Sequence, residues 1–445
     1  MTETTTPLGL ALLLSMGLLL LVVPRRYALL PVLVLACYMP IAQAVMVGGL
    51  HFYMLRILLI FGWLRLLLRG ELHWRGLTAI DKAFLAWVLS GLVLGSLLWG
   101  DMVGLVNRLG YAYDAMGVYF LFRALLRDED DIVRAFKQLA ILAVPLAASM
   151  VFEKFSGMNP FYVLGGVKEF DQVRDGVIRS QAAFGASILA GVFGASLIPY
   201  FVALWRRSRW LAAIGLVAAT LITFTAGSSG PVMAYGAAIL GIVLWRVRYQ
   251  MRLVRWGIVL MLAGLQAVMK GPVWWAISHV SIFSGNTAWY RSNLIDKFVM
   301  SIGDWWLVGT RSTASWGTVI GEGAFQGADI TNMFVRVGVD GGLLTLIFFL
   351  LIIVRCFRGV GVSFRAATAI GESRSTQFAV WALGAALFTH IVAFFDVQYF
   401  DQNFVTWCLL LAMISCATKL FHTAPQAAVV PLEVRETVGE LQPQL

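Results

Sequence analysis

The sequence predicts an all-α fold, a polytopic bundle of transmembrane helices, and three observations lead to this fold class. Of the 445 residues, 60% are hydrophobic and only 13% are charged, whereas a soluble domain carries roughly 25% charged residues. The hydrophobic residues fall in repeated blocks of about 17–25 residues, the length that a helix needs to cross a bilayer. Because backbone groups in lipid must be hydrogen-bonded within their own segment, these blocks should be helices.

Thirteen apolar blocks qualify as spans, and we expect about 12–14. They lie at 8–23, 28–47, 51–68, 80–98, 103–125, 138–153, 182–204, 210–226, 231–246, 256–270, 332–354, 376–396 and 402–421. The first block is short, and 51–68 and 103–125 contain arginines. Residues 1–422 therefore form one transmembrane domain. The tail at 423–445 lacks apolar periodicity and is predicted to be disordered.

The positions of the basic residues predict the orientation in the membrane. Of the 34 Lys and Arg residues, 23 lie in connections that alternate with connections poor in basic residues. The positive-inside rule places the basic connections, and the C-terminal tail, in the cytoplasm. These short clusters also account for the net charge of +10, so we expect no nucleic-acid partner.

Two connections are long, 154–181 and 271–331, and both fall on the opposite, periplasmic side. Loops of this size in an otherwise tight bundle are usually functional, and the second is expected to be partly helical. Positive charge on this side runs against the topological rule, so each basic residue there needs an acidic partner or a ligand. These basic residues are Arg56, Arg108, Lys154, Lys168, Arg174, Arg179, Lys270, Arg291, Lys297, Arg311 and Arg336.

The outer arginines have two interpretations. A guanidinium presents a planar fork of donors that suits phosphate oxygens, and several arginines together could hold a diphosphate without metal. Ion pairing is the preferred interpretation for any one arginine, whereas the whole set is expected to contain at least one that binds a ligand. The candidate ion-pair partners are Glu153, Asp171, Asp175, Asp296, Asp304 and Asp340.

Metal and cofactor chemistry has no sequence signature here. The five histidines are isolated, with no HExxH motif and no His/Asp cluster, so no metal and no cofactor are expected. His279, in the large outer loop, and His390, in a late span, are the two that could lie near an outer site. Each is more often a structural polar residue than a ligand.

Four short stretches between residues 175 and 400 resemble the O-antigen ligase and Wzy-type polysaccharide polymerase superfamily, membrane glycosyltransferases of the GT-C type. The segment 178–185 is similar to the family's arginine that opens the span after the first outer loop, here Arg179. The segment 224–231 looks like its Ser-rich turn, although many members have an arginine there and this chain has none. Tyr290 and Arg291, followed by 305–310, resemble the arginine-containing amphipathic segment of the large loop.

The fourth stretch, 331–342, matches the family's His-Asn-x-aromatic-Leu followed by acidic-x-Gly in its spacing. Asn332, Phe334, Asp340 and Gly342 fit the pattern. Thr331 stands where the family usually has a histidine that, in ligases, acts on the acceptor hydroxyl. Because threonine cannot serve as a general base at neutral pH, this departure favours a polymerase over a ligase.

The resemblance implies a periplasmic-face polymerase of the bacterial inner membrane that joins undecaprenyl-diphosphate-linked repeat units of an exopolysaccharide or O-antigen, with inversion. Its donor and acceptor are both such lipid-linked oligosaccharides, in contact with membrane lipids, and its further partners are chain-length regulators or export proteins. The alternatives are an O-antigen ligase that transfers the glycan to a lipid A core, and a carrier or flippase of lipid-linked glycans.

The resemblance also assigns roles to individual residues. Arg179 and Arg291 are expected to bind the diphosphate and neutralise the charge that builds on the leaving group. The base must come from elsewhere, and the candidates are Asp329, His279 and Asp340. The remaining predicted substrate-binding residues are Tyr290, Arg311, Asn332, Arg336 and Asp340.

Overall fold

The computed structural model of this chain is a helical membrane bundle, which confirms the predicted fold class. Among the described residues, seven helices are long and apolar enough to cross a membrane, and two more apolar helices, Pro7–Val22 and Arg209–Thr225, are shorter. The structure describes the chain except for residues 1–4, 48–49, 73–75, 171, 175, 280–284, 321–325, 401 and 428–445.

A helix is present at each of the thirteen predicted spans. These helices are α1 (Pro7–Val22), α2 (Leu29–Tyr38), α3 (Met54–Leu68), α4 (Ala79–Trp99), α5 (Met102–Leu125), α6 (Glu129–Ser156), α7 (Ser187–Leu204), α8 (Arg209–Thr225), α9 (Ser229–Val243), α10 (Met251–Val268), α13 (Met333–Ala369), α14 (Arg374–Phe394) and α15 (Gln402–Ala427). The last of them continues into the segment predicted as a tail.

The remaining elements are short, except for a helix of 16 residues, α11. They are the helices η1 (Arg25–Tyr27), η2 (Pro160–Leu164), η3 (Leu244–Gln250), η4 (Val273–His279), α11 (Gly285–Met300), α12 (Ile302–Trp305) and η5 (Ala314–Trp316), and the strands β1 (Ala44–Val47), β2 (Leu50–Tyr53), β3 (Gln172–Arg174), β4 (Val177–Arg179), β5 (Val319–Ile320) and β6 (Gly327–Ala328). The strands pair in sequence order as three small antiparallel hairpins. Most of these elements lie in the two long connections, so the large connection is partly helical, as predicted.

The span predicted at 28–47 is wrong in its length. The block 28–47 forms a helix only as far as Tyr38, after which Met39 is extended, and 44–47 is the strand β1. The physical reason is Pro40, because a proline disfavours the helical conformation of the residue before it. The hairpin of β1 and β2 then leads directly into α3.

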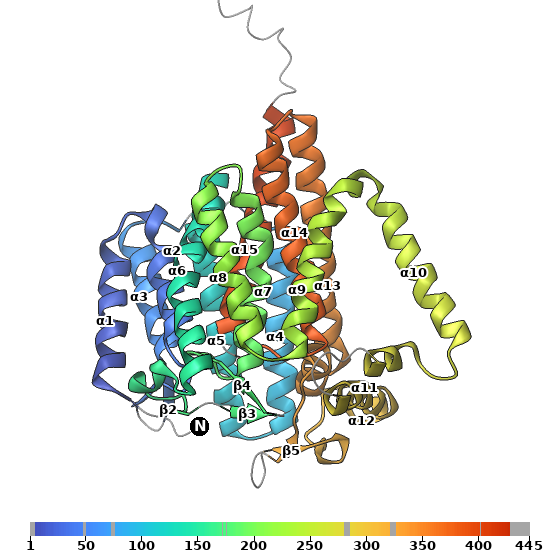
Figure 1. Cartoon of the computed structure of the whole chain (residues 1–445). Helices are drawn as coiled ribbons and strands as arrows, with labels where there is room; N and C mark the ends of the chain where they lie inside the picture. Colours follow the sequence, from blue (N-terminus) through green and yellow to red (C-terminus); the bar gives the residue numbers. More distant parts are fainter. Residues whose placement is uncertain are drawn as a thin grey trace, which may run out of the picture.

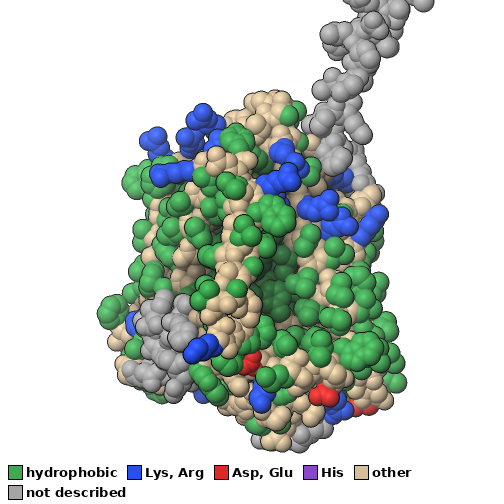
Figure 2. Space-filling view, turned by 90° about the vertical axis from the view of Figure 1, so that its right-hand side faces the viewer, with side chains coloured by type: hydrophobic (Ala, Val, Ile, Leu, Met, Phe, Trp, Pro, Cys, Tyr) green, Lys and Arg blue, Asp and Glu red, His purple; other side chains and the backbone are tan. Residues whose placement is uncertain are grey.

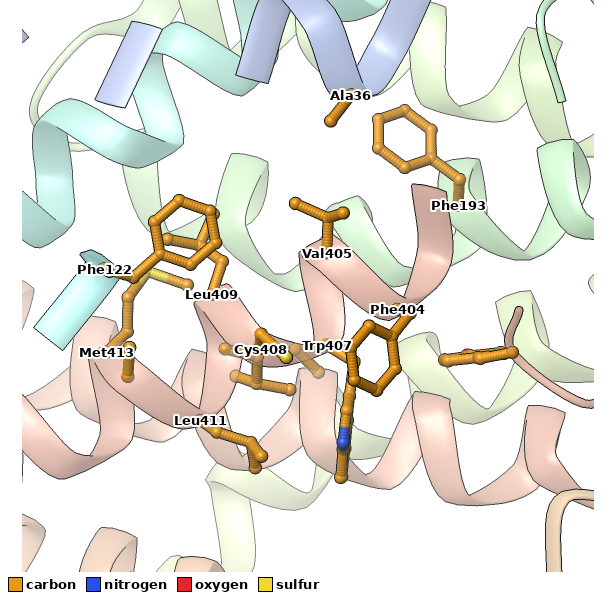
Figure 3. Packing of buried hydrophobic residues seen from close by; sticks show 14 of the residues in the cluster. Ala36, Phe122, Phe193, Phe404, Val405, Trp407, Cys408, Leu409, Leu411 and Met413 are labelled. Carbon is orange, nitrogen blue, oxygen red and sulfur yellow. The ribbon is translucent and has the colours of Figure 1, made fainter. Parts of the chain in front are cut away.

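Helix α15 is the central helix of the bundle. Every side chain from Gln402 to Ala417 is buried, and α15 contacts α13, α5, α14 and α7. Figure 3 shows part of this hydrophobic cluster, in which side chains of α15 lie together with Phe122 of α5, Ala36 of α2 and Phe193 of α7. An apolar helix with no solvent- or lipid-facing side belongs in the middle of a bundle.

The two ends of the bundle differ in charge and in structure. Lysine and arginine side chains gather at the end shown at the top of Figure 2, where α14 begins and α15 ends (Figure 1). The hairpin of β3 and β4, helices α11 and α12 and strand β5 lie at the opposite end (Figure 1). We call the first the basic end and the second the loop end.

Helix α10 stands apart from the bundle (Figure 1). None of its residues is buried, and among the described elements its main contacts are with the flanking η3 and η4. In a space-filling view an apolar hollow lies beside it (Figure 2). The helix carries Arg252 and Arg255 in its first turns and is largely apolar beyond them, so its exposed apolar side chains suit a lipid environment.

Candidate functional site

One buried carboxylate at the loop end is paired with an arginine of the large connection and lies within the electrostatic range of an arginine of the other long connection. Arg291, on α11, forms an ion pair with Asp396, which follows α14. Both side chains are almost fully buried, with 3% and 1% of their surface exposed. Arg179, at the end of β4, lies close enough for its charge to act on the same carboxylate. The two arginines predicted to act together are therefore neighbours in the structure.

The start of α9 forms the wall of this arginine–carboxylate cluster. A Cβ atom added to Gly230, in the first turn of α9, would lie 1.1 Å from Oδ2 of Asp396, so the carboxylate packs directly against the helix backbone. The N-terminus of a helix favours an anion because its first N–H groups have no partner within the helix. The carboxylate thus faces two guanidinium groups and a helix N-terminus.

Asp396 is the member of this cluster that the sequence interpretation missed. It was placed at the end of an apolar span and was not among the acidic partners considered for the arginines. A signal was available, because an acidic residue at the end of a span is costly and usually functional. In the structure, burial raises the pKa of Asp396 to about 6, while Arg291 and Arg179 oppose this rise.

Backbone hydrogen bonds fix the position of Arg179. The neighbouring Ser180 donates its N–H to the carbonyl of Thr225, at 3.3 Å. Gly227 has φ +58°, and a Cβ there would lie 3.4 Å from Cγ of Arg179. The Ser-rich turn before α9 therefore packs against β4 and can do so because a glycine adopts this conformation without strain. The segment therefore serves as a structural turn between α8 and α9.

Glu153 holds the segment after Arg179. Its carboxylate accepts hydrogen bonds from the N–H groups of Gln181 and Ala182, both at 2.8 Å. Ala182 has φ +50°, a conformation that costs a non-glycine residue about 1 kcal/mol or more. Glu153, considered above as an ion-pair partner, thus binds backbone groups and pins the strained connection between β4 and α7.

A second charged cluster lies at the beginning of α13. The carboxylate of Asp340 accepts a hydrogen bond from Nε of Arg336 at 2.7 Å, and Nη2 of Arg108, on α5, lies 3.3 Å from it. For Arg336, ion pairing is therefore the interpretation that the structure supports. Arg311 differs, because its guanidinium lies over the ring of Trp99, 4.3 Å from the ring centre.

The two motif segments of the large connection and α13 contact each other. The N–H of Leu343 donates to the carbonyl of Trp306 at 2.8 Å, and that of Thr310 donates to the carbonyl of Val339 at 2.9 Å. Both bonds depend on a break in α13 at Gly342, where φ is +73°, a conformation that suits glycine.

A cavity of about 420 Å³ opens beside this second cluster. Its walls combine aromatic rings, the charged groups Arg108, Arg336 and Asp340, and polar amides. The residues that line the cavity are Trp87, Val88, Gly91, Leu92, Trp99, Asn107, Arg108, Tyr111, Met333, Arg336, Val337, Asp340, Thr345, Gln398, Tyr399 and Phe400. Ligand cavities typically have this size and this mixture of apolar walls with a few convergent polar groups.

The loop 395–400 joins the cavity to the arginine–carboxylate cluster. Asp396 belongs to the cluster, and Gln398 to Phe400 line the cavity. The hydroxyl of Tyr399 is 2.7 Å from Nδ1 of His390, which is fully buried. His390 therefore acts as a structural residue that holds the loop, as was preferred for it.

Asn332 connects the start of α13 to the same loop. Its side-chain oxygen accepts hydrogen bonds from the N–H groups of Phe334 and Val335, at 3.0 and 3.1 Å, and so caps the helix. Its amide nitrogen reaches the carbonyl of Phe395 at 3.5 Å. The adjacent Thr331 hydroxyl is buried and has no hydrogen-bond partner among the described residues. Asn332 thus orients the segment that carries Thr331.

The large connection brings Tyr290 and Asp329 together. The Tyr290 hydroxyl donates to the backbone carbonyl of Asp329 at 2.6 Å. Burial raises the pKa of the Asp329 carboxyl, and burial together with Asp329 raises the pKa of Tyr290. A carboxyl with a raised pKa is a better proton acceptor than an ordinary one. The side chain of His279, the other loop candidate for the base, lies outside the described residues.

Within the described part of the chain, no group of three or more His, Cys, Asp or Glu side chains could hold a metal ion. The four cysteines are buried and unbridged. No protein-family model matches this chain, and the search of curated proteins finds no similar protein either. The fold and the two charged clusters are therefore what supports a functional assignment.

Proposed function

We propose that this protein is a membrane glycan polymerase that joins diphosphate-linked lipid-oligosaccharide repeat units at the loop end of the bundle. The observation that carries the proposal is the convergence of Arg179 and Arg291 on the single buried carboxylate of Asp396. A diphosphate carries more charge and more acceptor oxygens than a carboxylate, so it competes well for the two guanidinium groups. Nε of Arg291 is buried without a hydrogen-bond partner among the described residues and supplies a further donor.

The cavity beside Asp340 supports binding of a sugar chain. Trp87, Trp99 and Tyr111 present flat apolar rings, which suit the C–H faces of sugar rings, while Asn107 and Gln398 offer amide groups for hydroxyls. In this proposal the cavity holds the acceptor glycan, and the arginine–carboxylate cluster holds the diphosphate of the donor. The loop 395–400 lies between the two groups.

The isolated helix α10 supports binding of a lipid tail. Its exposed apolar side chains include Leu260 and Met261, with 69% and 60% of their surface exposed. A polyprenyl chain can lie along this face without leaving the apolar layer. In the proposal the lipid tail stays in the membrane while the diphosphate reaches the loop end.

The reaction is a displacement at the anomeric carbon of the donor sugar. The acceptor hydroxyl oxygen forms the new glycosidic bond as the bond from that carbon to the diphosphate oxygen breaks, and the diphosphate leaves with the electron pair. Arg179 and Arg291 stabilise the charge on the leaving diphosphate. The hydroxyl proton passes to the carboxylate of Asp329, because Asp340 is already in contact with two arginines.

Thr331 favours the polymerase over the ligase alternative. Its hydroxyl cannot accept a proton at neutral pH, and the resemblance associates the missing histidine with ligases. The two alternative functions, a ligase and a carrier of lipid-linked glycans, are therefore distinguished from the polymerase by the experiment below.

The test is incubation of the purified protein with radiolabelled lipid-linked repeat units from the organism that carries it. Longer lipid-linked chains are expected. Transfer to a lipid A core would instead establish a ligase, and movement across liposomes with no new glycosidic bond would establish a carrier. Arg291→Ala and Arg179→Ala should each abolish turnover in folded protein, while Arg365→Ala, an exposed arginine at the basic end, should leave it unchanged. Full activity of both loop-end variants would refute the diphosphate assignment.

A further inference from the structure

A separate cavity of about 330 Å³ lies at the basic end, far from the site described above. It is formed where α7 and η3 end and α14 begins, so it lies at the ends of membrane-spanning helices. Its polar groups are three arginines, Arg206, Arg248 and Arg374, and the hydroxyl of Ser375. The rest of its wall is apolar, with Trp205 and Trp245 the largest side chains.

The three arginines lack the carboxylates that normally neutralise such a group. Among the described residues, no ion pair involves Arg206, Arg248 or Arg374, and no acidic residue lines the cavity. The adjacent Arg207 provides the contrast, because it binds Glu129 and donates to the hydroxyl of Ser375 at 3.0 Å. Three like charges around one cavity repel one another unless an anion lies between them.

The aromatic floor of this cavity fixes one of the arginines. The guanidinium of Arg248 lies 4.3 Å from the ring centre of Trp245 and 4.5 Å from that of Tyr249. It also donates to the carbonyl of Trp245 at 3.0 Å. The ring of Trp245 is itself held by Phe378, at a centroid distance of 5.0 Å. The charge at the base of the cavity is therefore held rigidly, and Nε of Arg248 is buried without a hydrogen-bond partner among the described residues.

We propose that this cavity binds the phosphate of an anionic phospholipid in the leaflet at the basic end. The three arginines and the N-terminus of α14 attract the phosphate. Trp205, with 48% of its surface exposed, is an amphipathic ring of the type found at the membrane–water interface. The cavity is large enough for a headgroup, and the acyl chains can lie along the neighbouring apolar helices. This site is independent of the proposed transferase site.

The test measures lipid binding to the full-length protein in detergent. Phosphatidylglycerol and phosphatidylcholine with the same acyl chains are titrated, and bound lipid is counted by native mass spectrometry. The wild type should retain phosphatidylglycerol in preference. At about fivefold in affinity for each arginine that faces the lipid phosphate, the triple variant R206Q/R248Q/R374Q should lose on the order of a hundredfold.

The matched control removes three arginines of the basic end that do not line the cavity, R209Q/R358Q/R365Q, and should retain the wild-type affinity. If the triple variant folds poorly, the single variant R374Q should still show about a fivefold loss. Equal losses in the two triple variants, or equal binding of phosphatidylcholine, would overturn the proposal. Displacement of the lipid by glycerol phosphate at the same concentration would also overturn it, by identifying a site for soluble phosphate.

Discussion

Replacing Gly230 by alanine probes the contact on which the proposed diphosphate site depends. The added Cβ would lie 1.1 Å from Oδ2 and 2.2 Å from Cγ of Asp396, so either the helix or the carboxylate must move. Either the start of α9 shifts, at an overpacking cost of about 1–3 kcal/mol, or Asp396 turns away from Arg291. The second response leaves a buried guanidinium without its partner, which costs about 3–5 kcal/mol.

The expected loss of unfolding free energy in Gly230→Ala is therefore between about 1 and 5 kcal/mol. It is measured by denaturant titration of the detergent-purified protein. Gly236→Ala is the matched control on the same helix, because nothing lies within 4 Å of a Cβ at that position. This variant should match or slightly exceed the wild type, since alanine is a better helix former than glycine by about 1 kcal/mol.

A double-mutant cycle separates the steric contact from a general effect on α9. In an Asp396→Ala background the added methyl group enters the space that the carboxylate vacates. Gly230→Ala should then cost at least about 1 kcal/mol less than it does in the wild type. Additive effects of the two substitutions, or equal stability of Gly230→Ala and Gly236→Ala, would refute the placement of Asp396 against α9.

Three further predictions concern single side chains. Burial raises the pKa of Asp396 to about 6, above its unfolded value of about 3.9, so the stability that this carboxyl contributes is full below pH 4 and is lost as the pH rises through 6. The unfolding free energy of Asp396→Asn relative to that of the wild type should therefore increase between pH 4 and pH 6. A difference that stays constant with pH would contradict the prediction. Asn332→Ala should lower the unfolding free energy by about 1 kcal/mol through loss of the helix cap, whereas Asn332→Ser should retain most of the wild-type unfolding free energy. Equal losses in the two variants would exclude capping by Asn332. Asp329→Asn should abolish polymerisation without changing the unfolding free energy. The rate of the wild type should rise with pH through a pKa above the ordinary carboxyl range. An active Asp329→Asn variant would exclude Asp329 as the base.

The helical bundle could be predicted because a membrane span depends on local composition. An apolar block of about twenty residues must satisfy its own backbone hydrogen bonds in lipid, whatever the rest of the chain does. The span predicted at 28–47 is shorter in the structure because Pro40 disfavours a helical conformation at Met39. The position of α10 could not be predicted, because an apolar helix has the same composition whether it faces lipid or other helices.

By itself, the sequence determined the fold class and the alternation of basic and non-basic connections, and the family resemblance singled out Arg179 and Arg291 as a hypothesis. Only the tertiary structure decided what those arginines contact, because Arg291 and Asp396 are distant in sequence and come together through the packing of α9, α11 and the loop after α14. The tertiary structure also pairs Arg336 and Arg108 with Asp340. It places Arg206, Arg248 and Arg374 around a cavity that no acidic residue among the described residues lines. Residue type states which partners a charged group can accept, but burial and geometry decide which partner it has.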